Sequence, residues 1–335
     1  MTLNNKLQVP TTLNFDPARA MELANLIWLA NVQYDENKQN KNPWQNGTQI
    51  VGSNQLNFNA PTSTGDGTIQ YNLLSSFWFT EVAFLELSTV PFGFIVERVI
   101  QGKIEIFIVF RGTREKAEWI DNTEFDQVPF LKDDGSLGKV SRGFNKIFTR
   151  KYDDLFGVGL FNPIGRDPLN TLQKRSIQQT ILDTLEQCPV DAEIYITGHS
   201  LGGALATLAT LSVVQQTNLS SPILYSFASP RVGNKMFAEQ FDGLDCYRIA
   251  NSEDLVPTVP PATSDLVGDE IKKDQTLSIA EKNRLDALDS LRGLFSGTLL
   301  KQDYEHVGYS LYFTDHRGSV SFNHNLEQTY RQAIS

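Results

Sequence analysis

One stretch near the middle of the chain constrains its fold more than any other. The run EIYIT, residues 193–197, has the composition of a short strand, and the Gly-rich turn after it leads into an Ala/Leu/Thr segment that suits a buried helix, residues 198–210. Further strands are expected at 223–227 and 245–250, and a helix at 171–187. Because strands that alternate with helices form parallel sheets with crossover helices, the sequence predicts an α/β fold.

The first third of the chain predicts three further elements. Asp16-Pro17 is typical of a helix start, and apolar residues at helical spacing predict an amphipathic helix over 17–34. Residues 35–70 are rich in Asn, Gln, Gly, Ser and Thr and indicate irregular structure. Residues 1–76 are therefore expected to form an N-terminal helix followed by an irregular segment. A hairpin is expected from the runs 92–100 and 104–110, which flank Gln101-Gly102-Lys103.

Composition excludes several classes of protein. The chain has 29 Lys and Arg against 39 Asp and Glu, and a net charge of −10 argues against a protein that binds duplex nucleic acid. Its two cysteines, Cys188 and Cys246, cannot build a disulfide framework or a thiolate metal cluster. We see no secretory leader and no run of the ~18 apolar residues that would span a bilayer, so we expect a soluble, cytoplasmic protein. With no linker or repeat in 335 residues, we expect one domain over 1–335.

The predicted turn between strand and helix carries the pattern G-x-S-x-G as Gly198, Ser200 and Gly202. A serine at the apex of such a turn has a strained backbone, and side chains two residues away on either side would collide with the turn. The turn also directs the positive end of the helix toward the place where an oxyanion would form. The pattern alone arises by chance in about one chain in ten. Its position between a strand and a helix makes Ser200 a candidate nucleophile.

The sequence around this turn resembles that of the class 3 lipases, which are α/β-hydrolases of the fungal triacylglycerol-lipase type. The matching segments, in chain order, are 108–113 (IVFRGT), 118–121 (EWID), 140–144 (VSRGF), 198–208 (GHSLGGALATL), 227–234 (FASPRVGN), 248–257 (RIANSEDLVP) and 304–308 (YEHVG). The resemblance implies a mostly parallel central sheet flanked by helices. The chain departs from the pattern at Ser141, where the family usually has His, and at Ala228 and Ser229, where Gly and Gln are common.

A serine nucleophile needs a histidine base, and the chain has four histidines. In this fold the order along the chain is Ser, acid, His, which eliminates His199. The resemblance favours His324, because the family's catalytic His precedes a similar final helix. His306 matches a position that is structural in the family, and His316 lies in a turn-like, solvated string. We therefore expect His324 to be the base, with His306 and His316 as alternatives.

The acid and the oxyanion hole follow from the same resemblance. Asp254 lies in the turn after a predicted strand, where the family has its acid, and Glu253 is the adjacent alternative. The backbone N–H of Leu201, directly after the nucleophile, should be one oxyanion donor. Thr113, in the loop after an earlier strand, should be the other. A plain β-turn is the alternative interpretation of residues 111–113.

Two segments are candidate covers for the site. Residues 114–130 mix charges with Trp119, Ile120 and Phe125, as a lid would that exposes apolar surface at a lipid interface. The alternative is a surface loop packed on the core. Residues 264–303 are an apparent insertion that includes a helical pattern. That segment is a second cover, an interfacial anchor or a helix packed on the domain.

These observations predict an enzyme that hydrolyses carboxylic esters of acylglycerolipids. The resemblance allows triacylglycerols, phospholipids or galactolipids as substrates, at a membrane or lipid-droplet interface. It implies no metal and no organic cofactor. Two alternatives stay open: a small-molecule carboxylesterase without interfacial activation, and a non-catalytic relative that binds a lipid or a partner protein.

Overall fold

A computed structural model of the chain describes residues 5–38, 49–52, 69–83, 86–113, 124–151, 175–260 and 302–335. Its centre is an eight-stranded sheet in the order β1-β2-β3-β4-β7-β8-β9-β10. The strands are β1 (Gln49–Gly52), β2 (Ile69–Ala83), β3 (Glu86–Ile100), β4 (Lys103–Phe110), β7 (Glu193–His199), β8 (Ile223–Phe227), β9 (Cys246–Asn251) and β10 (Tyr309–Phe313). A separate two-stranded sheet pairs β5 (Gln127–Pro129) with β6 (Lys139–Ser141).

The central sheet has an antiparallel half and a parallel half. Strands β1 to β4 pair antiparallel in sequence order. Strands β4, β7, β8, β9 and β10 pair parallel, so their carboxyl ends meet at one edge. The loops after these strands carry Thr113, Ser200, Asp254 and His324. Parallel strands therefore bring segments that are distant in sequence to one edge, where open α/β sheets bind their ligands.

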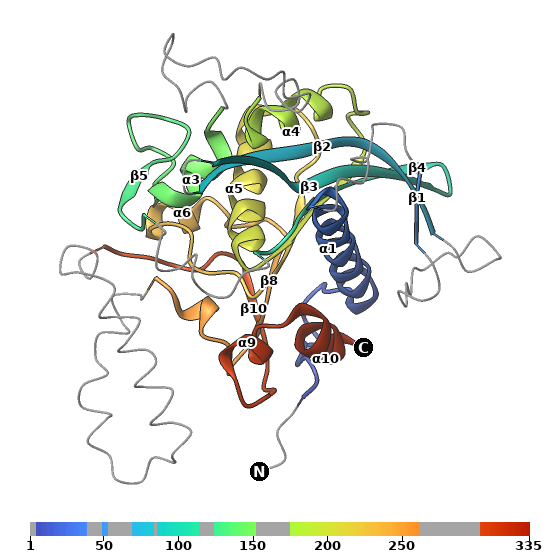
Figure 1. Cartoon of the computed structure of the whole chain (residues 1–335), viewed down its shortest axis with the longest axis vertical. Coiled ribbons are helices and arrows are strands. Elements are labelled where there is room, and N and C mark those ends of the chain that lie inside the picture. The colour runs from blue at the N-terminus through green and yellow to red at the C-terminus, as the bar shows by residue number, and fades with distance from the viewer. Residues whose placement is uncertain are drawn as a thin grey trace.

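Helices cover both faces of this sheet (Figure 1). One face packs against α1 (Pro17–Lys38) and the C-terminal elements η7 (Leu326–Tyr330) and α10 (Arg331–Ile334). The other face packs against α3 (Arg142–Thr149), α4 (Ile177–Leu185), α5 (Leu201–Gln216) and α6 (Lys235–Glu239). Two short elements complete the description, the 3₁₀ turn η4 (Val256–Thr258) and α9 (Val320–Asn323).

Side chains alternate between the two cores as strand geometry requires. On β4, Ile106 and Ile108 face the α5 side, whereas Phe107 and Val109 face the α1 side. Helix α5 is buried all round from Leu201 to Val213, which explains its apolar sequence. The mostly parallel sheet with helices on both faces confirms the α/β prediction.

Most expected elements are present, and one expectation was wrong. The hairpin between β3 and β4 turns at Gln101 and Gly102, whose φ angles of 50° and 79° suit a two-residue turn. The expectation that residues 35–70 are irregular is wrong in three places. Helix α1 extends to Lys38, strand β1 lies within this range, and strand β2 begins near its end. Pairing across a sheet gives a strand here that local composition does not favour. Most of the lid candidate (114–123) and of the insertion (264–301) lies outside the described residues.

Candidate active site

Ser200 stands at the junction of β7 and α5 with φ 59° and ψ −128°, a backbone conformation that an L-residue rarely adopts. The two glycines of the motif make this turn possible. A Cβ on Gly198 would collide with the carbonyl of Gly202, and a Cβ on Gly202 would collide with the carbonyl of Arg111. The strained serine is therefore held by backbone packing on both sides, as the sequence pattern predicted.

The side chain of Ser200 is fully buried, and within the described part of the chain its Oγ has no hydrogen-bond partner. Its backbone N–H donates to the carbonyl of Phe227 over 2.9 Å, which ties the turn to β8. Leu201 is the first residue of α5, so its N–H has no acceptor within the helix. Oγ is thus left without a hydrogen bond inside the described part of the chain, and the Leu201 N–H without one inside its helix.

The loop after β4 lies directly against this turn. A Cβ on Gly112 would be 3.7 Å from Ser200 Cβ and 2.9 Å from His199 Nδ1, so Thr113 follows a residue in contact with the serine. The buried side chain of Arg111 holds the loop, because it donates to the carbonyls of Gly112 (2.9 Å) and Pro91 (2.7 Å). This contact fixes the loop that carries the second candidate oxyanion donor.

His324 and Asp254 form a hydrogen bond between Nδ1 and Oδ2 of 2.7 Å. Asp254 is 1% exposed, and the same Oδ2 accepts a 2.6 Å hydrogen bond from the hydroxyl of Tyr330. Its Oδ1 accepts from the backbone N–H of Val256 over 3.0 Å. Because a carboxylate only accepts, Nδ1 of His324 carries the proton and Nε2 is the nitrogen that can accept one.

His199, next to the serine, joins His324 to this site. Its Nε2 lies 2.8 Å from the carbonyl oxygen of His324, and the two rings are 4.6 Å apart. The carbonyl can only accept, so His199 carries its proton on Nε2. Burial first, and then the charge of His324, lower the pKa of His199 well below 6.5. His199 therefore stays neutral and anchors the backbone of His324.

The other two histidines lie elsewhere. His306 is buried and its Nε2 lies 2.8 Å from the carbonyl oxygen of Pro257. His316 is half-exposed, with Nδ1 3.3 Å from Glu253 Oε2. Among the described histidines, only His324 contacts Asp254.

Tyr330 and Asn251 are site residues that the sequence reasoning missed. Besides its bond to Asp254, the Tyr330 hydroxyl accepts the backbone N–H of Asn251 over 3.1 Å. The Asn251 side chain donates to the carbonyls of Asp315 (2.8 Å) and Asn323 (3.1 Å). These contacts connect the end of β9, just before Asp254, to the segment that carries His324. In the sequence, Tyr330 is one of the apolar positions of the last helix. Such a position usually indicates a core residue, so the sequence carried no signal that Tyr330 contacts Asp254.

Of the candidate lid residues, Trp119 and Ile120 lie outside the described residues, and Phe125 lies in the core. Its ring packs edge-on against Phe144 with centroids 5.9 Å apart, and its carbonyl accepts the hydroxyl of Tyr304. The C-terminal part of the segment 114–130 is therefore packed on the domain.

The described residues give no sign of a metal site or a membrane span. No group of three or more His, Cys, Asp or Glu among them could hold a metal ion. None of the helices in the described ranges is long and apolar enough to cross a membrane.

Comparisons with known proteins agree with this geometry. The family model for lipase (class 3) matches residues 107–264, a range that includes Thr113, Ser200 and Asp254. A phospholipase A1-II 6 from Oryza sativa subsp. japonica is 31% identical over 185 residues, which cover 48% of this chain and 41% of the relative. A lipase from Rhizomucor miehei is 33% identical over 162 residues, which cover 47% of this chain and 38% of the relative.

The solved structure of a mutant form of MDLA from Penicillium cyclopium shares the fold. Its TM-score is 0.52 at 19% identity, over 93% of this chain and 84% of that chain. The chain spans about two fifths of the length of the curated relatives that it matches. The matched segment contains the strained serine turn and the turn that carries Asp254, on a sheet covered by helices on both faces. Residues 107–264, slightly less than half of the chain, thus match the class 3 lipase family, and the fold is that of the α/β-hydrolases.

Proposed function

We propose that this protein is a carboxylic ester hydrolase in which Ser200 is the nucleophile, His324 the general base and Asp254 the acid. The observation that carries the proposal is the 2.7 Å bond from His324 to Asp254 beside a strained serine whose Oγ has no partner among the described residues. His199 links these groups, because it precedes the serine in the chain and bonds the backbone of His324.

In the first half of the reaction, Ser200 Oγ attacks the ester carbonyl carbon while its proton passes to His324 Nε2. Asp254 stabilises the imidazolium that results. The tetrahedral intermediate collapses when His324 gives the proton to the leaving alkoxide oxygen, which departs as an alcohol and leaves an acyl-serine. Water then repeats the sequence on the acyl-serine, with His324 again as base and acid, and releases the carboxylic acid and free Ser200.

The developing oxyanion is proposed to accept hydrogen bonds from the N–H of Leu201 and from Thr113, through its N–H or its hydroxyl. Fixed donors of this kind are worth about 3–4 kcal/mol each in the transition state, because they need no reorganisation. The side chain of Arg111 supports this assignment indirectly, since its bonds to Gly112 and Pro91 hold the Thr113 loop against the serine turn.

The proposed substrates are acylglycerolipids. Relatives of this chain carry the names phospholipase A1 and lipase, which favours phospholipids or triacylglycerols over galactolipids. The whole chain is proposed to act as one domain, with Trp119 and Ile120 of the segment 114–130 contacting the lipid surface. A small-molecule carboxylesterase without interfacial activation is the competing function.

The decisive experiment combines one variant with a substrate panel. Ser200→Ala should abolish ester hydrolysis and labelling by a fluorophosphonate probe, whereas Ser136→Ala, an exposed serine in a turn, should leave both unchanged. Labelling of Ser200→Ala at the wild-type level would refute the nucleophile assignment.

The substrate class is tested on the unmodified protein with p-nitrophenyl esters of increasing chain length, beside triacylglycerol, phospholipid and galactolipid micelles. An acylglycerolipid hydrolase should be faster on long-chain esters above the concentration at which they aggregate. Activity confined to short, soluble esters would instead support the small-molecule carboxylesterase.

A further inference from the structure

A small polar cavity lies behind the candidate active site, between α5 and the segment that leads into β10. Its volume is about 10 Å³, which is the space that one water-sized particle needs. The polar residues that line it are Thr207, Ser226, Ser229, Arg248, Glu305 and His306. None of them takes part in the proposed reaction.

The guanidinium of Arg248 is incompletely paired in this cavity. Arg248 is 4% exposed, and its Nη2 donates to Ser310 Oγ and, over 2.8 Å, to the hydroxyl of Tyr312. Its Nε and Nη1 are also buried and have no hydrogen-bond partner among the described residues. A buried cation that lines the cavity therefore has two donor nitrogens without a partner in the described part of the chain.

The charges around the cavity favour a negative occupant. Within the described ranges no carboxylate forms an ion pair with Arg248, although Glu305 lines the same cavity. Burial first, and then the charges of Arg248 and Arg231, lower the pKa of His306 well below 6.5, so His306 is neutral at pH 7. Since an unpaired buried charge is strongly unfavourable, the site needs a countercharge more than it needs another neutral group.

We propose that this cavity binds one monatomic anion, with chloride as its occupant, through Nε and Nη1 of Arg248 beside the hydroxyl of Ser226. A chloride ion is only slightly larger than a water molecule and fits a cavity of this size, whereas sulfate and phosphate do not. A water molecule would fit but would leave the charge of Arg248 uncompensated.

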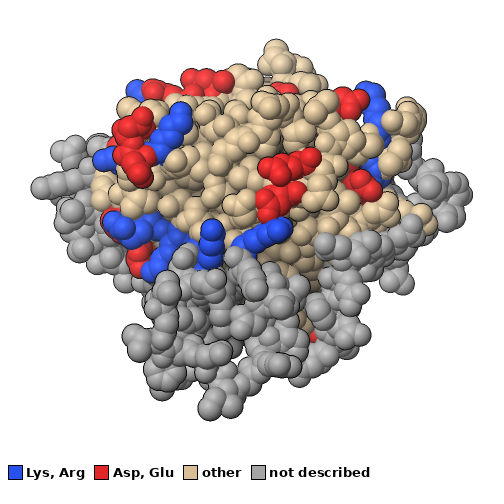
Figure 2. All heavy atoms as spheres, turned by 90° about the horizontal axis from the view of Figure 1, so that it is seen from above, with Lys and Arg blue, Asp and Glu red and all other residues tan. Residues whose placement is uncertain are grey.

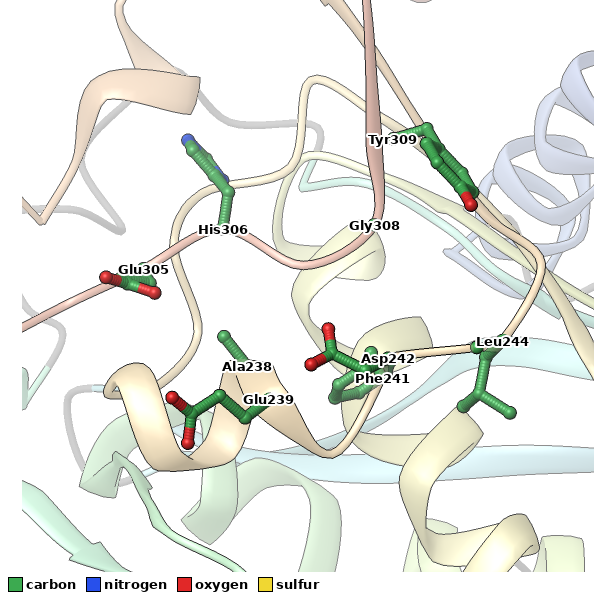
Figure 3. Close-up of a pocket in the computed structure, with 10 residues that line it drawn as sticks. Ala238, Glu239, Phe241, Asp242, Leu244, Glu305, His306, Gly308 and Tyr309 are labelled. Carbon is green, nitrogen blue, oxygen red and sulfur yellow. The ribbon is translucent and has the colours of Figure 1, made fainter. Parts of the chain in front are cut away.

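A larger open pocket of about 280 Å³ adjoins the cavity and shares Glu305 and His306 with it. Figure 3 shows Glu239 on α6 and Asp242 in the turn after it, opposite the segment with Glu305 and His306. These three carboxylates repel polyvalent anions more strongly than monovalent ones. The surroundings therefore disfavour a singly charged ion less than a polyvalent one.

The first test measures thermal unfolding of the full-length protein in sodium chloride and in sodium gluconate at equal ionic strength. Chloride bound only to the folded state should raise Tm in a saturable way, by about 3–4 °C at a hundredfold excess over Kd. Gluconate is too large for the cavity and should give no saturable rise. Equal Tm values in both salts at every concentration would overturn the proposal.

A pair of variants at Ser310 tests the role of the missing countercharge. Ser310 faces Arg248 in the β9–β10 register, and its Oγ already contacts Nη2. Ser310→Glu should supply a carboxylate, raise Tm in gluconate above that of the wild type and abolish the response to chloride. Ser310→Gln is similar in size but neutral, and should keep that response. An undiminished chloride response in Ser310→Glu contradicts the proposal.

Anomalous diffraction from crystals soaked in sodium bromide locates the ion directly. The expected result is a bromide peak within hydrogen-bond distance of Arg248 Nε and Nη1. Density for a water molecule there, with no anomalous signal, would show that the cavity is hydrated instead. None of these measurements depends on ester hydrolysis, so their outcome is separate from that of the proposed function.

Discussion

Single residues at the candidate active site are fixed in their donor and acceptor roles as well as in position. Asp254 Oδ2 accepts from both His324 and Tyr330, so in the proposed reaction His324 Nε2 is the ring nitrogen that takes the proton from Ser200. His199 is held in one tautomer by the carbonyl of His324. Because His324 already has the tautomer that the proposed reaction needs, no tautomer change has to precede proton transfer.

Asp254→Asn tests this arrangement at one residue. The amide would favour the wrong tautomer of His324, so kcat should fall by about 10⁴-fold with little change in the fold. Steady-state kinetics on p-nitrophenyl esters and a thermal melt measure the two effects. Glu253→Gln alters the neighbouring carboxylate, which contacts His316, and should keep kcat within about twofold of the wild type. A loss below tenfold in Asp254→Asn would remove Asp254 from the proposed triad.

At the scale of elements, the strand-to-helix turn depends on close backbone contacts. Gly202 lies against the carbonyl of Phe110, at the end of β4, and that of Arg111, in the loop after it. Helix α5 therefore approaches the neighbouring strand as closely as a glycine permits. The serine is thereby brought to the carboxyl edge of the sheet beside the Thr113 loop. Helix–strand packing therefore decides where Oγ lies.

Gly202→Ala should therefore destabilise the fold by about 3 kcal/mol or more and eliminate activity, because the added methyl overlaps backbone that cannot move. Gly135→Ala is the matched control, since Gly135 has φ +70° and open space around it. Only conformational strain of about 1–2 kcal/mol is expected there, with activity kept. Urea unfolding of both variants checks the difference, and equal losses of stability would contradict the packing argument.

Helix α1 is attached to the sheet by a buried cluster of charges. Arg19 and Arg98 both pair with Glu22 and with Glu105, and the hydroxyl of Tyr71 donates to Glu22. All four ionic side chains are at most 9% exposed. Each cation has two carboxylates and each carboxylate two cations, which is what makes burial of such a cluster tolerable.

Glu22→Gln should lower the free energy of unfolding by about 3–5 kcal/mol, because two buried guanidiniums then share one carboxylate. Glu193→Gln breaks an exposed 3.7 Å ion pair with Lys103 and should change the free energy of unfolding by less than about 1 kcal/mol. Chemical denaturation of both variants measures the contrast. A Glu22→Gln protein as stable as Glu193→Gln would show that the cluster does not hold α1.

At the scale of the whole molecule, charge is spread in small groups. Acidic and basic side chains occur in small clusters on the face seen in Figure 2, several of them with both signs side by side, and broad areas of other residues lie between them. The buried titratable groups matter more to overall stability. His199 and His306 both have pKa values well below 6.5, in each case chiefly because of burial.

Stability should therefore fall as the pH drops below about 6.5. In this range the unfolded chain protonates both histidines, with pKa values near 6.5, while the folded protein leaves them neutral. The unfolded state then binds up to two more protons, so the free energy of unfolding should fall by up to about 3 kcal/mol per pH unit from these groups. Above pH 6.5 their contribution is constant. Urea unfolding between pH 5 and 8 measures this slope.

Two variants separate the contributions. His306→Gln keeps a donor for the carbonyl of Pro257 and should remove about half of the slope between pH 5 and 6.5. His316→Gln changes a half-exposed histidine and should leave the slope as it is. An unchanged slope in His306→Gln would contradict the assignment of His306 as a buried neutral group.

The sequence by itself determined the α/β class and the serine turn, because both depend on local patterns: strands of β-branched residues, a buried helix and two glycines where no Cβ fits. It also ranked the histidines, through a resemblance in the segment before the final helix. Tertiary structure alone decided that Tyr330 and Asn251 support Asp254, that β1 forms within a polar segment and that Arg248 is buried without an ion pair to any described carboxylate. Those facts depend on residues that are distant in the chain and meet only when β1 pairs with β2, and when β9, β10 and the C-terminal helices pack together, so no local pattern can encode them.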